Sequence, residues 1–116
     1  MRNIVFYRTE SGASPIEDFP DSLHGKQAQR VSWVLRLIEE IDSVPAQYFK
    51  KMPGTQEIWE VRAQAGKDTI RLLGFLSGSS LVLTSGFAKK TRKAPPIEIA
   101  LAEQRRREYL NRSKKQ

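Results

Sequence analysis

The sequence predicts a small α+β domain built around one antiparallel β-sheet of about four strands, in the order strand, two helices, three strands, helix. Its 116 residues fit one compact domain, and the 39% of hydrophobic residues suffices for one modest core. Helical periodicity is limited to a few segments, whereas three apolar runs are separated by short glycine-containing connections. We therefore expect a single domain over residues 1–116.

The N-terminal elements follow from local signals. The run Ile-Val-Phe-Tyr at residues 4–7 is typical of a strand. Ser14 then offers a hydroxyl N-cap, Pro15 fits the first helical position, and Glu17 can reach the free backbone amides. These signals predict a short helix that ends near Pro20 or Leu23.

A second, amphipathic helix is predicted over residues 26–42. Its apolar residues recur at steps of three and four and form one stripe for burial: Ala28, Val31, Val34, Leu35, Ile38 and Ile41. Val44 and Pro45 end the helix, and residues 48–54 are expected to form a loop that carries Lys50 and Lys51.

Three further strands are predicted over residues 57–63, 68–76 and 81–87. The connections at 64–67 and 77–79 contain the glycines that tight hairpins need, so an antiparallel meander is expected. Alternation in the first of these strands places Trp59 and Val61 on one side and Glu60 and Arg62 on the other. The two N-terminal helices would then cover one face of the sheet.

A last helix should begin near Ile97, because Pro95 and Pro96 suit a first helical turn. From Gln104 onward the sequence is almost wholly charged, so we expect the helix to extend into solvent and residues 112–116 to form a disordered tail.

Composition excludes several classes of site and location. The chain has no cysteine and only one histidine, His24, so thiolate metal sites, cysteine nucleophiles and multi-histidine metal cages are excluded. No apolar run is long enough to span a membrane. The first residues lack the apolar core of a secretory signal, so we expect a cytoplasmic protein. We also expect no metal or small-molecule cofactor.

The positive charge lies at the C-terminal end. The net charge is +7, yet residues 1–85 hold ten basic and ten acidic side chains, while residues 86–116 hold ten basic and three acidic ones. Such asymmetry is typical of a surface that binds a polyanion such as RNA or DNA. A solvated basic tail is the structural alternative.

Two groups of basic residues are candidates for that contact. Arg62 and Arg71 lie on adjacent predicted strands, where two like charges on one face favour an anion between them; alternatively each reaches a carboxylate such as Glu57 or Glu60 and stabilises the sheet. A loop with four cations follows the last strand and can bind phosphates: Lys89, Lys90, Arg92 and Lys93.

These residues carry a family resemblance. The segments Ile-Trp-Glu-Val-Arg at 58–62, Thr-Ile-Arg-Leu-Leu at 69–73, Gly-Phe-Ala-Lys-Lys-Thr-Arg-Lys-Ala-Pro at 86–95 and Glu-Ile-Ala-Leu-Ala at 98–102 resemble the RelE/ParE toxin superfamily, and within it the HigB-like, phage-derived toxins. The similarity covers nearly the whole chain.

The resemblance implies a RelE-like fold and the toxin of a type II toxin–antitoxin pair, which cuts mRNA on the ribosome and is silenced by a helix-turn-helix antitoxin. It implies that Arg62 and Arg71 lie near the cleavage site. It also implies that the basic segment of Lys89, Lys90, Arg92 and Lys93 contacts RNA. We expect Lys50 and Lys51 to bind the nucleic acid as well.

The chemistry of RNA cleavage by its own 2′-hydroxyl needs a base, stabilisation of the phosphorane charge, and help for the departing 5′-oxygen. Arginine supplies the second function well. Glu60 or Lys89 can take the proton, whereas His24 lies far along the chain from the sheet arginines and is more typical of a turn or cap. The sequence departs from better-defined relatives in having Ala88 after Phe87, where a tyrosine or histidine is expected.

Two other functions stay open. A non-catalytic inhibitor of DNA gyrase, like the ParE branch, needs no acid–base pair. A basic nucleic-acid-binding accessory protein would be explained by the charge asymmetry alone.

Overall fold

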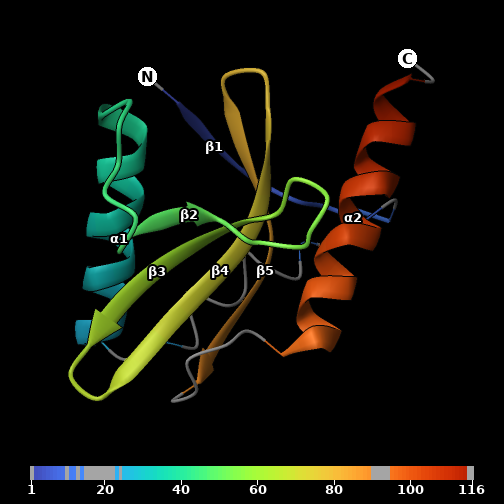
Figure 1. Cartoon of the computed structure of the whole chain (residues 1–116). Helices are drawn as coiled ribbons and strands as arrows, with labels where there is room; N and C mark the ends of the chain where they lie inside the picture. Colours follow the sequence, from blue (N-terminus) through green and yellow to red (C-terminus); the bar gives the residue numbers. More distant parts are fainter. Residues whose placement is uncertain are drawn as a thin grey trace.

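Five strands form one sheet in the order β1-β5-β4-β3-β2 in the computed structural model, with a helix on either side (Figure 1). The structure describes residues 2–9, 11–12, 14, 23, 25–89 and 95–114. The elements are β1 (Asn3–Phe6), α1 (Gly25–Glu40), β2 (Phe49–Lys51), β3 (Trp59–Ala65), β4 (Asp68–Ser77), β5 (Ser80–Lys89) and α2 (Pro96–Lys114). The α+β class is confirmed, and the β3-β4-β5 meander has the predicted antiparallel pairing.

The sheet is mixed, so the prediction of an all-antiparallel sheet is wrong. β1 pairs in parallel with β5, from Asn3 opposite Ser80 to Phe6 opposite Leu83. Hairpin signals report only pairing between strands that are neighbours in the sequence, and β1 and β5 are separated by every other strand.

β2 is a fifth strand where the sequence predicted a loop. Phe49 lies opposite Val61 and Lys51 opposite Trp59, in antiparallel register. Phe49 is buried, and its ring stacks on Trp59 with 4.7 Å between centroids. A strand of three residues is too short to show an alternating pattern, so tertiary packing defines it.

α1 covers one face of the sheet. Its buried residues Val31, Val34 and Ile38 belong to one core cluster with residues of β3, β4 and β5, among them Val61 and Leu83. The helix ends at Glu40, close to the predicted Asp42, and the Arg2 guanidinium there donates hydrogen bonds to the carbonyls of Ile38, Ile41 and Asp42 at 2.6–3.0 Å. The short helix predicted from Ser14 lies largely outside the described residues.

α2 covers the other face. Ala102 and Ile99 pack near Ile58, Leu73 and Phe87, and farther along the helix Tyr109 and Leu110 pack near Tyr7, Phe75 and Val82. The helix continues to Lys114, past the point where the sequence predicted a tail. Both faces are therefore covered by helices, one N-terminal and one C-terminal (Figure 1).

A β-bulge interrupts the pairing of β4 with β5 between Leu73 and Gly74. The extra residue, Thr84, donates from its hydroxyl to the Leu73 carbonyl at 3.1 Å, and its own carbonyl accepts a hydrogen bond from Arg105 on α2 at 2.5 Å. Gly74 is required here, because a Cβ would lie 2.3 Å from the Val82 carbonyl oxygen.

Candidate functional site

Three of the candidate residues meet on the α2 face of the sheet. Arg62 on β3 lies directly opposite Arg71 on β4. Glu60 lies two residues before Arg62 on the same face and binds both: its Oε1 accepts from Arg62 Nη2 at 2.8 Å and its Oε2 from Arg71 Nη1 at 2.9 Å. The alternation predicted for this strand is confirmed, because Val61 is buried on the opposite face against α1.

The three side chains differ in exposure. Those of Glu60 and Arg71 are 2% and 4% exposed, whereas that of Arg62 is 33% exposed. The Arg62 Nε is buried and has no hydrogen-bond partner among the described residues. Arg71 is therefore a buried neighbour of the carboxylate, and Arg62 is the guanidinium that solvent or a ligand can reach.

Lys50 and Lys51 on β2 are separated by the pleat of the strand. Lys50 is exposed and lies opposite Glu60, so its Cβ shares a face with Glu60 at a separation of about 5 Å. Lys51 lies opposite Trp59 and forms an ion pair with Glu57 at 2.9 Å. This ion pair lowers the pKa of Glu57. Only Lys50 of the two adds charge beside Glu60.

The basic segment after β5 is only partly described. The backbone of Lys89 pairs with that of Thr69 on β4. Lys89 lies two residues after Phe87, and Phe87 lies opposite Arg71. Lys90, Arg92, Lys93 and also His24 lie outside the described residues.

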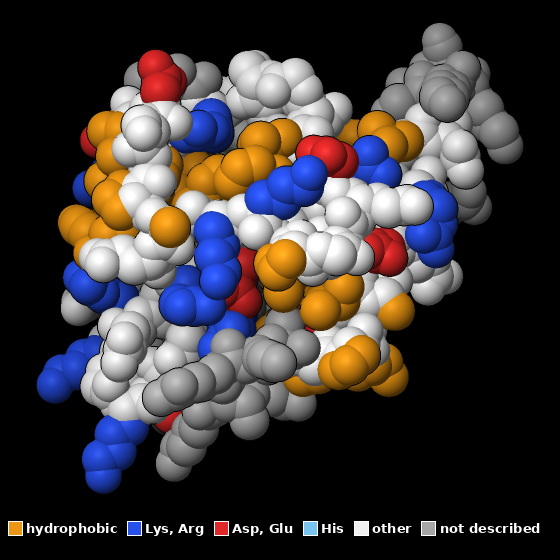
Figure 2. Space-filling view, viewed as in Figure 1, with side chains coloured by type: hydrophobic (Ala, Val, Ile, Leu, Met, Phe, Trp, Pro, Cys, Tyr) orange, Lys and Arg blue, Asp and Glu red, His pale blue; other side chains and the backbone are white. Residues whose placement is uncertain are grey.

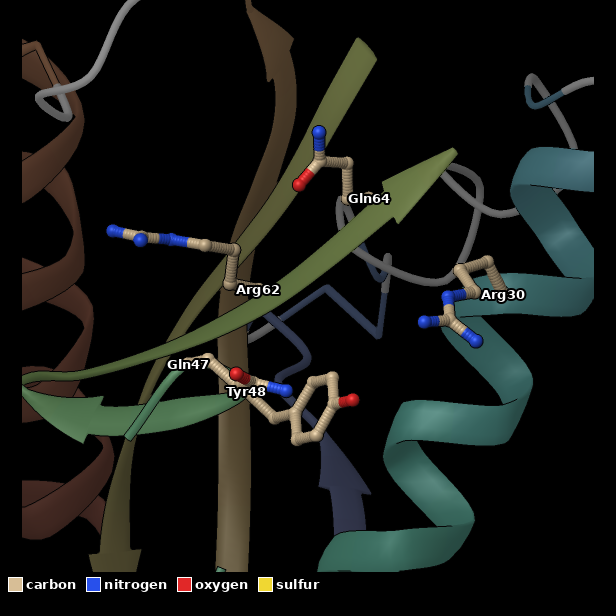
Figure 3. Close-up of a pocket in the computed structure, with 5 residues that line it drawn as sticks. All are labelled: Arg30, Gln47, Tyr48, Arg62 and Gln64. Atoms are coloured by element: carbon tan, nitrogen blue, oxygen red, sulfur yellow. The ribbon is translucent and has the colours of Figure 1, made fainter. Parts of the chain in front are cut away.

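A hollow of about 230 Å³ lies beside Arg62, and most of its lining residues were not predicted from the sequence to belong to the site. It is lined by Arg30 from α1, by Gln47 and Tyr48, and by Arg62 and Gln64 from β3. The Tyr48 ring is directed toward Arg30, whereas the Arg62 side chain extends away from α1 (Figure 3). The Tyr48 carbonyl accepts a hydrogen bond from the Arg62 amide at 2.8 Å, so β3 pairing fixes Tyr48 beside Arg62.

No local signal in the sequence identifies these neighbours. Tyr48 precedes a strand that the hydrophobic pattern does not reveal, and Arg30 has the exposed position expected of the polar side of an amphipathic helix. Tyr48 therefore shares a hollow with Arg62, but its phenol ring is directed toward α1 and not along the Arg62 side chain.

Several basic side chains gather at the surface over the sheet. Figure 2 shows Lys and Arg side chains gathered around acidic atoms over the central strands on this face. The cluster of Glu60, Arg62 and Arg71 carries two positive charges and one negative charge, and Lys50 adds a third cation. Its net charge suits an anionic ligand.

A second polar cluster joins α2 to the end of β1. The Tyr7 hydroxyl donates to Glu108 Oε2 at 2.6 Å, and Arg112 donates from Nε to Glu108 Oε1 at 2.8 Å. Burial, and then the hydrogen bond to Glu108, raise the pKa of Tyr7. The hydrogen bonds from Arg112 and then from Tyr7 lower the pKa of Glu108. This cluster holds the C-terminal half of α2 on the sheet.

The sequence of the chain matches a known protein family. The family described as "Phage derived protein Gp49-like (DUF891)" matches residues 16–107, which include Glu60, Arg62 and Arg71. The chain belongs to this family. The Gp49-like family comprises type II toxins of the RelE/HigB-like type, so the predicted toxin resemblance is confirmed at that level. No curated protein matches the chain.

Membership in the Gp49-like family implies an antitoxin partner for this chain. Neither α1 nor α2 is long and apolar enough to cross a membrane.

Proposed function

We propose that this Gp49-like protein is the toxin of a type II pair and a ribosome-dependent mRNA endonuclease that needs no metal ion. The observation that carries the proposal is the convergence of two guanidinium groups on one buried carboxylate, with an exposed lysine beside it. We further propose a helix-turn-helix antitoxin as its partner and the cytoplasm as its location.

Charge is the first support for RNA cleavage at this position. A phosphorane carries more negative charge than the phosphodiester from which it forms, so cations held in place beforehand stabilise it selectively. Arg62, Arg71 and Lys50 outnumber the single carboxylate of Glu60, and the sheet fixes the backbone of all four. The cations therefore stand close to the position where the charge develops.

The two arginines have different roles in this proposal. The Arg62 side chain is a third exposed, so its guanidinium can leave Glu60 and donate a hydrogen bond to a phosphate oxygen instead. Arg71 is almost fully buried, so it stays with Glu60 and orients that carboxylate. Displacement of Arg62 by the phosphate frees Glu60 Oε1 to accept a proton.

The reaction then balances as follows. The 2′-oxygen attacks the adjacent phosphorus while its proton passes to Glu60, and the bond from phosphorus to the 5′-oxygen breaks. The products are a 2′,3′-cyclic phosphate and a 5′-hydroxyl, whose proton comes from a lysine ammonium. Lys50 lies beside Glu60 by register, and Lys89 is the second candidate.

The test is expression of the chain without its antitoxin, followed by primer extension on mRNA. We expect discrete breaks that require ribosomes, and purified protein with ribosomes should cut equally well in EDTA. Intact transcripts would contradict the proposal, and accumulation of relaxed DNA in a gyrase supercoiling assay would select the ParE-like alternative.

A further inference from the structure

Trp33 is a large aromatic side chain on the exposed side of α1. It is 44% exposed, in contrast to the buried Val31 and Val34 beside it in sequence. The Arg30 guanidinium lies 4.6 Å from the centre of its ring, and the Tyr48 ring packs on it edge to face, with 5.4 Å between centroids. The indole is therefore held in one orientation while nearly half of it faces solvent.

Two shallow hollows adjoin Trp33. One, of about 410 Å³, includes Ser32 and Arg36 in its lining, and the other, of about 370 Å³, includes Lys26, Arg30 and Gly66. Arg30 also lines the hollow beside Arg62. Tyr48 likewise contacts Trp33 and lines that hollow. The surface around Trp33 therefore adjoins the hollow that Arg62 lines.

The lining of these three hollows has one sign of charge. Its charged residues are Lys26, Arg30, Arg36 and Arg62, and no acidic residue is among the described residues that line them. The remaining polar groups are mainly the amides of Gln29, Gln47 and Gln64 and the hydroxyls of Ser32 and Tyr48.

We propose that Trp33 is a base-stacking site for single-stranded RNA, with Arg30 and Arg36 bound to the phosphates on either side of the stacked base. The inference rests on the proposed function, because the RNA is the strand whose scissile phosphate lies at Arg62. Proteins bind single-stranded RNA by this combination of an aromatic face for a base and flanking cations for the backbone.

The chemistry of the surface favours RNA over a protein segment. An amphipathic helix or a strand of an antitoxin would need a broad apolar groove. Among the described residues that line the two hollows beside it, Trp33 is the one large apolar side chain. A stacked base needs only one aromatic face, and its phosphates need cations without nearby carboxylates.

Fluorescence of Trp33 tests the inference directly. The chain has two tryptophans, so a Trp59→Phe variant leaves Trp33 as the only indole reporter. A 2′-O-methyl RNA oligonucleotide cannot undergo attack by its 2′-oxygen, so binding is measured without cleavage. We expect saturable quenching of Trp33 at the concentrations at which fluorescence anisotropy of a dye-labelled oligonucleotide shows binding. Binding without quenching, or no binding at all, overturns the inference.

Substitutions separate stacking from charge. Trp33→Ala should weaken RNA binding about tenfold, and Trp33→Phe should retain most of the affinity because phenylalanine also stacks. Arg30→Ala should weaken binding and reduce its dependence on salt. Leu76→Ala and Arg107→Ala, which remove an exposed apolar side chain from β4 and an exposed cation from α2, are matched controls that should change neither.

The results also separate this inference from the proposed function. If Trp33→Ala binds RNA and cuts mRNA on the ribosome as the wild type does, the stacking site is refuted while the nuclease stands. If the wild type binds the oligonucleotide through Trp33 but never cuts mRNA, the stacking site stands and the nuclease is refuted. If Trp33→Ala loses only its affinity for the antitoxin, the surface is a protein interface and the inference is wrong.

Discussion

Arg62 and Arg71 lie directly opposite each other on β3 and β4, and both bind Glu60. Two like charges at facing positions of a sheet destabilise it unless an anion lies between them. The sequence is compatible with either an external phosphate or a carboxylate of the chain as that anion, and the structure contains the carboxylate of Glu60. Because one carboxylate serves two guanidinium groups and only Arg62 is accessible, the same cluster stabilises the sheet and keeps a cation available for a ligand.

Arg71→Ala should destabilise the fold strongly. Removal of Arg71 takes away the buried partner of Glu60, which is 2% exposed, and leaves the more exposed cations Arg62 and Lys50 to offset its charge. Breaking a buried ion pair in this way costs about 3 kcal/mol of unfolding free energy. Urea unfolding followed by tryptophan fluorescence measures it. Arg107→Ala, at an exposed position on α2, is the control and should stay within about 0.5 kcal/mol of wild type; an equally small effect of Arg71→Ala would contradict the role assigned to it.

Arg62→Ala should affect activity far more than stability. Arg71 still binds Glu60 in this variant, so we expect a loss of less than about 1 kcal/mol in unfolding free energy. Loss of the phosphate contact should lower the cleavage rate on ribosomes about a hundredfold. Arg62→Lys keeps the charge without the bidentate geometry and should recover part of the rate.

The matched control for Arg62→Ala is Lys67→Ala, at an exposed position in the β3–β4 turn, which should cut mRNA normally. Full activity of Arg62→Ala in the same primer-extension assay would remove Arg62 from the site.

Gly74→Ala should prevent stable folding or lower the unfolding midpoint sharply. The added Cβ would lie 2.3 Å from the Val82 carbonyl oxygen, which is backbone of the neighbouring strand and cannot rotate away. Gly25→Ala is the control, because a Cβ there meets nothing within 4 Å and the position is the first residue of α1. Circular dichroism with thermal unfolding compares them, and similar midpoints would show that the bulge can shift to accept a methyl group.

Glu108→Gln should destabilise the protein by about 1 kcal/mol at neutral pH and by less in acid. The pKa of Glu108 is lower in the folded chain than its ordinary value of 4.5, so its stabilisation is complete above that value. This stabilisation is lost as the pH falls through the pKa that Glu108 has in the folded protein. Below that pH the wild-type carboxyl is neutral, like the amide of the variant. Unfolding from pH 7 to pH 3 measures the difference.

Glu40→Gln, which changes an exposed carboxylate at the end of α1, should show a much smaller change between pH 7 and pH 3. A deficit for Glu108→Gln that stays constant with pH would mean that the ion pair with Arg112 contributes nothing.

Local patterns in the sequence were enough to place the second helix, the antiparallel meander and the shared face of Glu60 and Arg62. Each depends on a period of 3.6 or 2 residues or on a short turn, and these report how neighbouring side chains are directed. The same patterns placed Arg71 on the next strand. Of the segments that carry the toxin resemblance, the one at 69–73 lies in β4, the one at 58–62 lies almost wholly in β3, and the one at 98–102 lies in α2.

Only the tertiary structure decided which residues share the site. Tyr48 and Arg30 line the same hollow as Arg62 because of the pairing of a three-residue strand and the packing of α1 on the sheet, and neither leaves a periodic signal. The parallel pairing of β1 with β5 and the burial of Arg71 also depend on contacts between distant segments. A sequence pattern fixes the direction of a side chain on its own element, whereas its partners and its exposure are set by packing that brings remote parts of the chain together.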